Sequence, residues 1–503
     1  MMKSDILILR GAHVIDPRQG IDGVTDVVVA NGKIDFVGDA SHADGEVLDL
    51  TGHYLSPGWI DIHVHTYGTL GFSDPDAIGI YQGVTTFVDA GGAGIGVLDE
   101  FEATMSGLHT SLYAGPFVRP LGLIALNFLE GEIRSLGNIP LSDWVDFIKQ
   151  KPGLVRYLKC NAMGNYGPGS LKISKGLAQV LGVPLYMHIG EFQQHEVTES
   201  LAMEAFRIAE PGDMITHIYH GNLGKVVDDD GKVLDIVRKA QERGVLFDVG
   251  FGGYNFTWKV AEQATRQGLW PDTISSDLQQ FNVVTPVKSL ANVMTAMMIL
   301  GMGLNDVISR VTDRAAKSIS LQDEAGTLAP GMPADITVFD MIDEPLVVAD
   351  CILHKRTASQ YLKPLMAFKR GKRFDSDMDR AKAESNWLVQ FSEEKTPQRA
   401  KLLTGPQKVF LHDLAQALAQ VAWSITPEEE FDYDEALELQ RIFHATRAHH
   451  ALPLKACLDA IYFSFTDHQF PIQAGLFIMC QERDSFFSRI REICADQVAV
   501  EAL

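Results

Sequence analysis

Residues 59–65 read Trp-Ile-Asp-Ile-His-Val-His, an apolar run that ends in two histidines separated by one residue. Residues i and i+2 of a β-strand point to the same side, so His63 and His65 would face the same way. Imidazole is the commonest metal ligand among side chains, and two rings on one side form a chelating pair. Two hydrogen-bonded structural histidines are the alternative for an isolated pair. The preceding Ser-Pro-Gly at residues 56–58 favours a metal site, because it places the pair on the first strand of a larger pattern.

Seven more short apolar runs follow this strand, and helical patterns lie between most of them. The runs cover residues 84–89, 123–128, 154–159, 184–188, 213–217, 245–249 and 273–277. Eight strands that alternate with helices over about 250 residues fit an α/β fold of the (β/α)8 or TIM-barrel type. A doubly wound open sheet is the competing architecture, but eight alternations and the polar strand ends favour a barrel. We predict this barrel over residues 58–326.

Both flanks of the barrel segment are rich in β-forming residues, and Asn31-Gly32 between two such runs predicts a hairpin. We therefore predict one small β-sandwich domain built from residues 1–57 and 327–375. Residues 376–503 instead show helical periodicity and are predicted to form a separate all-α C-terminal domain. Its apolar stripe from Phe477 to Ile493 is expected to pack in a helical bundle that also supports self-association, so we expect a homo-oligomer.

The composition is that of an ordinary globular protein and excludes a disordered or fibrous chain. The 503 residues are 46% hydrophobic and 21% charged, and 43 basic against 65 acidic residues give a net charge of −22. An acidic chain is repelled by nucleic acids and anionic membranes, so neither is an expected partner. The sequence holds no run of 18 uncharged apolar residues, no signal-peptide core, and only five cysteines without CxxC spacing. We therefore predict a cytoplasmic protein.

Other residues of metal-binding type stand at the predicted strand ends. Lys159 ends the fourth strand, His188 ends the fifth, and His217 and Asp277 lie at the ends of the sixth and eighth. Taken singly, each has a structural explanation: an amphipathic lysine, a hydrogen-bonded core histidine or a helix-capping aspartate. Taken together they are not explained in that way, because the carboxyl ends of barrel strands converge on one mouth. The pattern therefore predicts a single functional site.

From about residue 5 to residue 373 the chain resembles the amidohydrolase superfamily, and most closely its dihydroorotase-like deacetylase branch. The matching segments are residues 14–17, 55–65, 83–91, 247–250, 326–328, 331 and 334–338. This resemblance implies a binuclear centre of divalent metals, with zinc as the expected metal. Two groups of residues would hold the metals: His63, His65 and Asp277 for one, and His188 and His217 for the other. Lys159 would bridge both metals as a carbamate formed with CO2. We recognise no family for the helical tail.

The implied reaction is hydrolysis of an amide C–N bond, in which a hydroxide that bridges the metals attacks the carbonyl carbon. Divalent metals lower the pKa of bound water from about 16 to about 7, and Asp277 would serve as the general base and acid. A lysine must be neutral to react with CO2, and burial near cations lowers its pKa. The expected substrate is an N-acyl or N-acetyl small molecule. The alternatives are a cyclic-amide hydrolase of the dihydroorotase or hydantoinase type and a non-catalytic barrel scaffold.

Four further residues are expected to contact the substrate: His220, Phe251, Tyr254 and Gln279. His220 lies three residues past His217 and competes with it as a ligand. The assignment favours His217, because in the superfamily the ligand follows the threonine that Thr216 matches. Members of the branch often carry histidine where Phe251 and Gln279 stand. The loss of both imidazoles predicts a substrate that differs from those of the branch.

Overall fold

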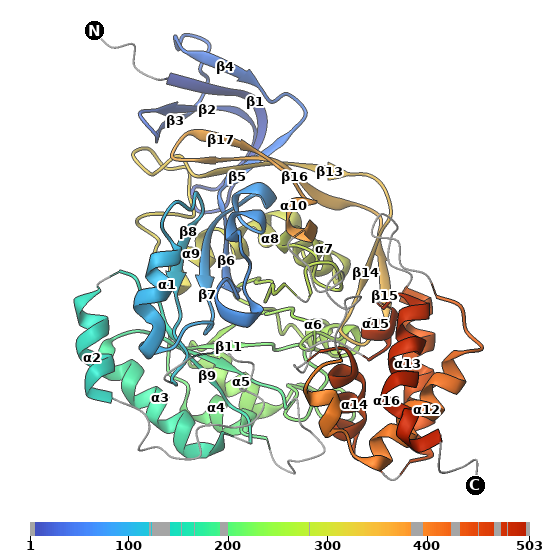
Figure 1. Ribbon diagram of the computed structural model, residues 1–503. Helices are drawn as coiled ribbons and strands as arrows, with labels where there is room; N and C mark the ends of the chain where they lie inside the picture. The colour runs from blue at the N-terminus through green and yellow to red at the C-terminus, as the bar shows by residue number, and fades with distance from the viewer. Residues whose placement is uncertain are drawn as a thin grey trace. The chain divides into compact units, whose positions relative to one another are not determined.

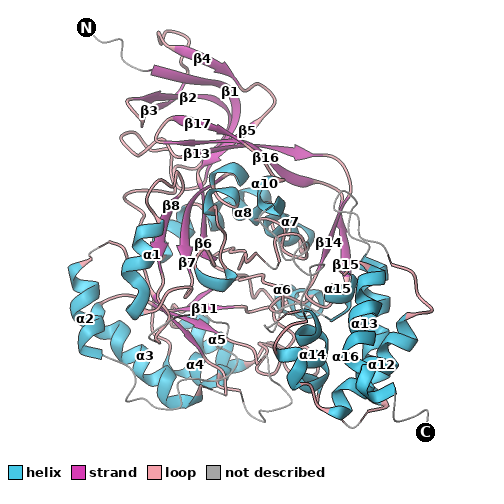
Figure 2. Cartoon of the chain, in the orientation of Figure 1, coloured by secondary structure: helices cyan, strands magenta, loops and turns pink. Residues whose placement is uncertain are grey.

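The computed structural model (Figures 1 and 2) contains two compact units. It describes residues 6–119, 122, 141–151, 153–164, 166–191, 200–280, 282–383, 396–423, 433–450, 452–466, 474–479 and 481–498. Unit 1 spans Met1–Phe192, Glu199–Val348 and Lys355–Glu384, and unit 2 spans Gln193–Thr198, Ala349–His354 and Ser385–Leu503. Every residue proposed as a metal ligand belongs to unit 1.

Strands from both flanks of the chain join in one eight-stranded sheet. They are β1 (Ile6–Asp16), β2 (Ile21–Ala30), β3 (Lys33–Gly38), β4 (Glu46–Asp49), β5 (Tyr54–Pro57), β13 (Ile336–Ile342), β16 (Tyr361–Lys369) and β17 (Lys372–Asp375). The order is β17-β16-β13-β5-β1-β2-β3, with β4 beside β1. Figure 1 accordingly shows the blue strands of the N-terminal flank beside the orange strands that follow residue 335. Both flanks contribute to the apolar core of this sheet, for example through Val14, Val27, Ile336 and Phe368.

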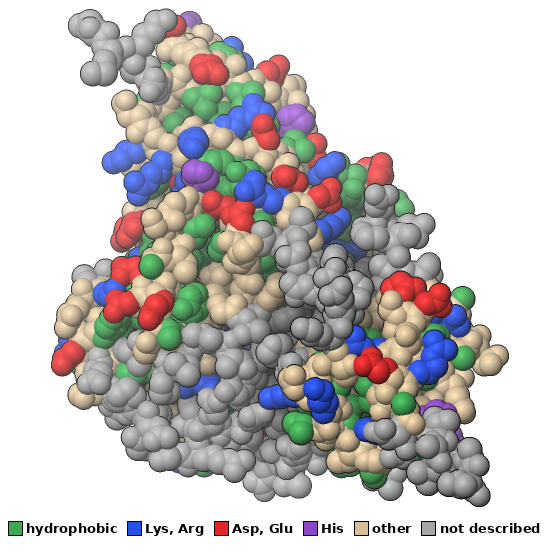
Figure 3. Space-filling model, viewed as in Figure 1, with side chains coloured by type: hydrophobic (Ala, Val, Ile, Leu, Met, Phe, Trp, Pro, Cys, Tyr) green, Lys and Arg blue, Asp and Glu red, His purple; other side chains and the backbone are tan. Residues whose placement is uncertain are grey.

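The predicted hairpin at Asn31-Gly32 is confirmed. It connects β2 and β3, which pair antiparallel, and both turn residues have left-handed backbones, with φ values of 52° and 74°. Two consecutive positive φ values match the twist of the flanking strands, and Asn and Gly adopt them at low cost. Near this sheet the surface carries both charges: Figure 3 shows Lys and Arg side chains interspersed with Asp and Glu.

Between the flanks, short parallel strands form two sheets. The first contains β6 (Trp59–Val64), β7 (Val84–Asp89) and β8 (Ser111–Ala114), and the second contains β9 (Leu158–Asn161), β10 (Leu185–His188), β11 (Met214–Thr216) and β12 (Leu246–Phe247). Parallel bridges Ala114–Val155 and Phe117–Lys159 connect β8 to the β9 segment. On the other side, the bridges Asp248–Thr273 and Val64–Leu278 lead from β12 back to β6. The pairing therefore returns to its starting strand, and the carboxyl ends of the strands meet at one end.

The structure corrects the predicted position of the third strand. β8 at Ser111–Ala114 pairs with β7, whereas the sequence pattern placed this strand at residues 123–128, which lie outside the described residues. The run Ser-Leu-Tyr-Ala is short and half-buried, so its hydrophobic pattern is weak. At the predicted eighth strand, residues 273–277, isolated bridges at Thr273 and Leu278 stand in place of a regular strand.

Helices follow most of these strands. They are α1 (Leu98–Thr104), α2 (Leu141–Gln150), α3 (Gly167–Leu181), α4 (Ala202–Ile208), α5 (Asp235–Glu242), α6 (Trp258–Arg266), α7 (Leu290–Ile299), α8 (Leu304–Val311), α9 (Asp313–Ser318) and α10 (Arg380–Ala383). α3 ends at Gly182 in the left-handed conformation, a common helix stop. Two further strands, β14 (Leu346–Ala349) and β15 (Lys355–Ala358), pair separately.

The described residues of unit 2 from residue 396 onward are mostly helical. Its helices are the short η7 (Arg399–Leu402), α12 (Gly405–Leu418), α13 (Tyr433–Ala448), α14 (Leu454–Phe465), α15 (Ala474–Met479) and α16 (Arg483–Val498). Thr404 and Gln407 form a capping box at the start of α12. The apolar stripe from Phe477 to Ile493 lies on two helices, α15 and α16.

The stripe in unit 2 is buried among the tail helices. Phe477 lies 5.0 Å from Tyr462 of α14 between ring centroids, and Phe486 lies 5.2 Å from Phe465. Phe477 and Phe486 are fully buried. Rings of the stripe therefore pack against other helices of the tail. Among the residues that the structure describes, every helix is too short or too polar to cross a membrane.

Candidate metal centre

His63 and His65 lie at and just beyond the carboxyl end of β6 and approach the same carboxylate. Asp277 Oδ1 is 3.0 Å from His65 Nε2 and 3.4 Å from His63 Nε2, and all three side chains are buried. The backbone contributes, since Asp277 N–H donates to the carbonyl oxygen of His63 over 2.7 Å. Asp277 also has a left-handed backbone, with φ at 52°. Such a conformation is uncommon outside glycine and persists where the surroundings enforce it.

Lys159 lies on β9 and reaches the same group of side chains. Its Nζ is 3.3 Å from His63 Nε2 and 4.5 Å from the centre of the Tyr186 ring. Only 2% of Lys159 is exposed. Burial lowers the pKa of its ammonium group to about 8, because a buried charge loses its hydration.

His188 ends β10, and His217 directly follows β11. Their ring centroids are 4.4 Å apart, and the His217 ring lies 5.1 Å from that of His63. His217 Nδ1 donates to the carbonyl oxygen of Gly250 over 2.6 Å, which leaves the lone pair on Nε2. His63, His217 and Asp277 each offer a ligand atom within 4.8 Å of the other two. The structure therefore brings His63, His65, Lys159, His188, His217 and Asp277 together at one end of the strands.

Three histidines of this group, His63, His188 and His217, are held in the neutral form. Burial lowers the pKa of His63, His188 and His217 well below the ordinary histidine value, and the charge of Lys159 acts in the same direction. Neutral imidazole is the form that binds metals, because a protonated ring has no lone pair to donate.

The lone pairs around Asp277 fit a cation. Tyr186 donates its hydroxyl hydrogen to Asp248 Oδ2 over 2.6 Å, so its oxygen accepts from His63 Nδ1–H over 2.9 Å. The Nε2 of His63 therefore carries a lone pair, and it faces the acceptor Asp277 Oδ1 at 3.4 Å. These two acceptors have no hydrogen to share with each other, although Lys159 Nζ lies 3.3 Å from the same nitrogen, and a cation between them relieves their repulsion. The residues present thus fit a divalent metal.

Comparison with known proteins shows sequence and fold relatives. No family model matches the chain. It is 33% identical over 336 residues to a deacetylase of Agrobacterium fabrum, which covers 65% of this chain and 81% of that protein. It is 30% identical over 387 residues to a deacetylase of Enterococcus faecalis, covering 75% and 100%. The chain belongs to the amidohydrolase superfamily.

Solved structures agree with this assignment. A structure described as an adenine deaminase matches with a TM-score of 0.67 and 28% identity, over 74% of this chain and 100% of that one. A dihydroorotase structure matches with a TM-score of 0.66 and 29% identity, over 74% and 99%. The chain is therefore an enzyme, a metal-dependent hydrolase of carbon–nitrogen bonds that acts on a small molecule.

Two side-chain amides hold the Asp277 carboxylate of this amidohydrolase. Gln279 Nε2 donates to Oδ1 and Asn255 Nδ2 donates to Oδ2, each over 3.1 Å. Gly252 makes room for this contact, since a Cβ there would lie 2.3 Å from Asp277 Oδ2. Gln279 was expected at the site, whereas Asn255 was missed. The glycine-rich loop Gly-Phe-Gly-Gly-Tyr-Asn at residues 250–255 was the available signal.

Three other residues were predicted to contact the substrate. For His220 and Phe251, the structure shows contacts with groups other than the candidate metal ligands. His220 is buried, its Nδ1 accepts from the backbone N–H of Asn222 over 3.1 Å, and burial lowers its pKa to about 3. Phe251 is fully buried and stacks on Phe256 at 4.3 Å. Tyr254 is half-buried. Their contact with substrate stays a prediction.

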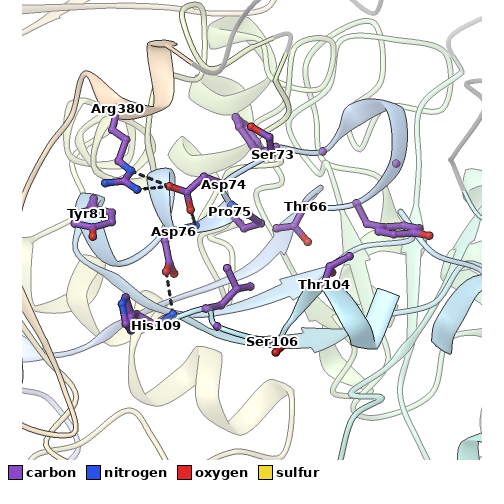
Figure 4. Close-up of a pocket in the computed structure, with 16 residues that line it drawn as sticks. Thr66, Ser73, Asp74, Pro75, Asp76, Tyr81, Thr104, Ser106, His109 and Arg380 are labelled. Atoms are coloured by element: carbon purple, nitrogen blue, oxygen red, sulfur yellow. Dashed lines mark hydrogen bonds and ion pairs between the residues drawn. The ribbon is translucent and has the colours of Figure 1, made fainter. Parts of the chain in front are cut away.

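A separate pocket of about 680 Å³ lies beside the loop that follows β6 (Figure 4). Thr66, next to His65, is one of its lining residues. Its charged groups are paired: Arg380 lies 2.6 Å from Asp74, and Asp76 accepts from the backbone N–H of His109 over 2.9 Å. The described residues that line it include none of the candidate metal ligands, so this pocket is distinct from the metal centre.

Proposed function

We propose that this amidohydrolase cleaves the amide bond of an N-acyl small molecule at a binuclear zinc centre. The ring of parallel pairings from β6 through β12 and back to β6 is, in this proposal, the (β/α)8 barrel, and the centre lies at its mouth. One observation carries the proposal. The buried lone pair of His63 Nε2 and the buried carboxylate of Asp277 face each other at 3.4 Å, an arrangement that suits a bound cation.

The six buried side chains divide between two metal positions. His63, His65 and Asp277 would hold the first metal, since the two Nε2 atoms lie 3.4 and 3.0 Å from the same carboxylate oxygen. His188 and His217, with ring centroids 4.4 Å apart, would hold the second. Lys159, whose Nζ is 3.3 Å from His63 Nε2, would lie between the two metal positions.

Lys159 would bridge the two positions as a carbamate. A neutral Nζ forms a bond to the carbon of CO2 and releases one proton, and the product carries one negative charge shared by its two oxygens. Because burial lowers the pKa of Lys159 to about 8, a fraction of the amine is neutral near pH 7. Hard oxygen donors suit divalent metals, so the modified lysine supplies what a bare ammonium group cannot.

Asp277 is the proton carrier in this scheme. A bound divalent metal supplies Lewis acidity, which lowers the pKa of a coordinated water and polarises a carbonyl group. Asp277 takes the proton from the attacking water and returns it to the nitrogen of the leaving amine. Asn255 and Gln279 orient the carboxylate for both steps through their 3.1 Å hydrogen bonds.

The substrate class is the open part of the proposal. The sequence relatives named deacetylases favour a linear N-acyl or N-acetyl compound. The dihydroorotase structure, at 29% identity, supports a cyclic amide as the second candidate. The scaffold alternative is set aside, because the relatives are named as enzymes and all six predicted ligand residues are present.

A two-part substrate panel tests the proposal. The zinc-loaded enzyme would be assayed with N-acetyl and N-formyl amino and hydroxy acids, and in parallel with dihydroorotate and hydantoins. We expect turnover in the linear series and none above that of Asp277→Asn in the cyclic series. Turnover confined to cyclic amides would replace the N-acyl assignment, and turnover unaffected by chelators would contradict the metal mechanism.

A further inference from the structure

Asp248 lies just after β12 and is a fully buried carboxylate that accepts four hydroxyl groups. Tyr186, Thr216 and Ser275 donate to Oδ2 over 2.6, 2.8 and 2.6 Å, and Thr273 donates to Oδ1 over 2.6 Å. Burial raises the pKa of Asp248, and its four hydrogen bonds act against that rise. In the ionised form the carboxylate only accepts hydrogen bonds, so each hydroxyl points its single hydrogen toward Asp248. The direction of every bond in this cluster is thereby fixed.

This direction determines the proton position on His63. The hydroxyl oxygens of Tyr186 and Thr216 lie 2.9 and 3.4 Å from His63 Nδ1, and their hydrogens are already donated to Asp248. Both oxygens can therefore only accept from the ring. His63 carries its hydrogen on Nδ1, and the lone pair on Nε2 faces Asp277 and Lys159.

A second branch leads from Asp248 to His217. Ser275 Oγ, whose hydrogen points at Asp248, accepts from the backbone N–H of Gly250 over 3.2 Å. The carbonyl oxygen of Gly250 accepts from His217 Nδ1 over 2.6 Å. Gly250 has φ at 46°, and a Cβ there would lie 2.1 Å from Thr216 Oγ1, so the peptide is packed tightly into the cluster.

We propose that Asp248 is a positioning residue that fixes the tautomer of His63 and, through Ser275, holds in place the Gly250 carbonyl that fixes the tautomer of His217, and so prepares both metal positions from one buried carboxylate. Tyr186 carries the effect to His63, and Ser275 with Gly250 carries it to His217. The inference rests on the proposed function for the role of these two histidines as ligands. Partners behind ligand histidines commonly change metal affinity by about 10–100-fold.

Two tyrosines provide a matched comparison. Tyr186→Phe removes the hydroxyl between Asp248 and His63 and keeps the ring. Tyr157→Phe is the control: Tyr157 is also fully buried, stacks on Tyr186 at 4.6 Å, and donates to the backbone oxygen of Ile62 over 2.7 Å. Both variants lose one buried hydroxyl group, which makes two hydrogen bonds in Tyr186 and one in Tyr157, so both should unfold at reduced temperatures. Only the first changes a contact of a metal ligand.

The first readout is metal binding by the full-length, metal-free protein. We expect Tyr186→Phe to weaken zinc binding by about 10–100-fold and to change the visible spectrum of the cobalt-loaded protein. Tyr157→Phe should leave affinity within about threefold and the cobalt spectrum unchanged. For the second branch, Ser275→Ala should weaken zinc binding more than Thr273→Val, since Thr273 donates to Asp248 without contacting Gly250 or either histidine.

The second readout needs no metal. Nitrogen NMR of histidine-labelled metal-free protein reports which ring nitrogen carries the hydrogen, with the His63 signal assigned from a His63→Gln variant. We expect His63 to be protonated on Nδ1 in the wild type and to become a mixture of tautomers in Tyr186→Phe. A wild-type His63 protonated on Nε2, or equal loss of zinc affinity in both tyrosine variants, would overturn the inference. A wild type that binds no metal would contradict the proposed function, and the NMR result would then decide the inference separately.

Discussion

At the scale of single residues, the carboxylate of Asp277 lies close to two candidate ligands and also accepts hydrogen bonds from two amides. It lies within 3.4 Å of two histidine nitrogens and accepts one amide hydrogen bond on each oxygen. Its left-handed backbone and its N–H bond to the His63 carbonyl fix it where the ends of the first and last parallel segments meet. The residue is therefore placed both to bind a metal and to move a proton.

Replacing Asp277 by asparagine separates these two roles. Asp277→Asn keeps the size and one acceptor oxygen, so we expect the variant to retain most of its metal and to fold normally. It cannot take up a proton, and kcat should fall by about 10²–10⁴-fold. Metal analysis beside steady-state kinetics checks this, and an active variant would assign proton transfer to another group.

In the proposed mechanism, Lys159 makes the assembly of the metal centre dependent on pH and on CO2. Burial lowers its pKa to about 8, so the neutral amine that reacts with CO2 increases as the pH rises through about 8 and then levels off. At constant dissolved CO2, metal-free protein should regain activity with zinc faster at pH 8.5 than at pH 6.5. Timed reactivation with and without CO2 measures this. A rate that is independent of CO2 would remove the carbamate from the scheme.

The sequence indicated the candidate metal ligands, but it did not indicate the residues that hold those ligands in position. The candidate ligands could be proposed because the ends of parallel strands converge, a rule that needs only the order of the strands. They are His63, His65, Lys159, His188, His217 and Asp277. Tyr186, Asp248 and Asn255 could not be singled out. Their contacts join strands and loops that lie far apart in the chain, and nothing in the local pattern of a buried Tyr or Asp indicates its partner.

At the scale of elements, the loop after β12 shapes the site through its glycines. Gly252 has φ at 54°, and its missing side chain leaves room for Asp277 Oδ2, which would be 2.3 Å from a Cβ. Gly268, which follows α6, has φ at 77° with nothing within 4 Å of the corresponding Cβ. Both glycines have a left-handed backbone that a residue with a side chain would adopt only under strain. Only at Gly252 would a Cβ also meet a neighbouring atom.

This pair gives a prediction for the loop. Gly252→Ala and Gly268→Ala should each lower the free energy of unfolding by about 1–3 kcal/mol through backbone strain. Only Gly252→Ala should also displace Asp277, and we expect it to lose about tenfold or more in kcat/KM. Denaturant unfolding and kinetics on both variants test this. Equal activities in the two proteins would show that the loop does not position Asp277.

Element positions followed from the sequence where the pattern was strong. The Asn31-Gly32 hairpin and most of the strand–helix alternation were predictable, because turn residues and apolar runs carry local information. β8 was not, since Ser111–Ala114 is short and alternates between buried and half-buried positions. Neither was the division of the tail stripe between α15 and α16, because helical periodicity continues across the break.

At the scale of the whole molecule, the proposed ligands and the helical tail belong to different units. All proposed ligands lie between His63 and Asp277 in unit 1, which extends to Glu384. Arg380 belongs to unit 1 as well, since it pairs with Asp74 at 2.6 Å. The proposed boundaries at residues 57, 326 and 375, the self-association of the tail and a cytoplasmic location stay predictions.

Truncation tests the independence of unit 1. A chain that ends after Glu384 keeps the Arg380–Asp74 pair, and we expect it to fold and to bind the same amount of metal per chain. If the helical tail supports self-association, light scattering should show fewer subunits than in the full chain. An insoluble or metal-free product would show that the tail is part of the core fold. An unchanged subunit number would remove the assembly role.

The central claim is that six converging side chains hold two metals. Its most direct test is anomalous scattering at the zinc absorption edge from crystals of the active, zinc-loaded enzyme. We predict two peaks about 3.5–4 Å apart, one beside His63, His65 and Asp277 and the other beside His188 and His217, with carbamate density on Lys159 between them. An active enzyme whose crystals show no anomalous peak among these residues would contradict the account.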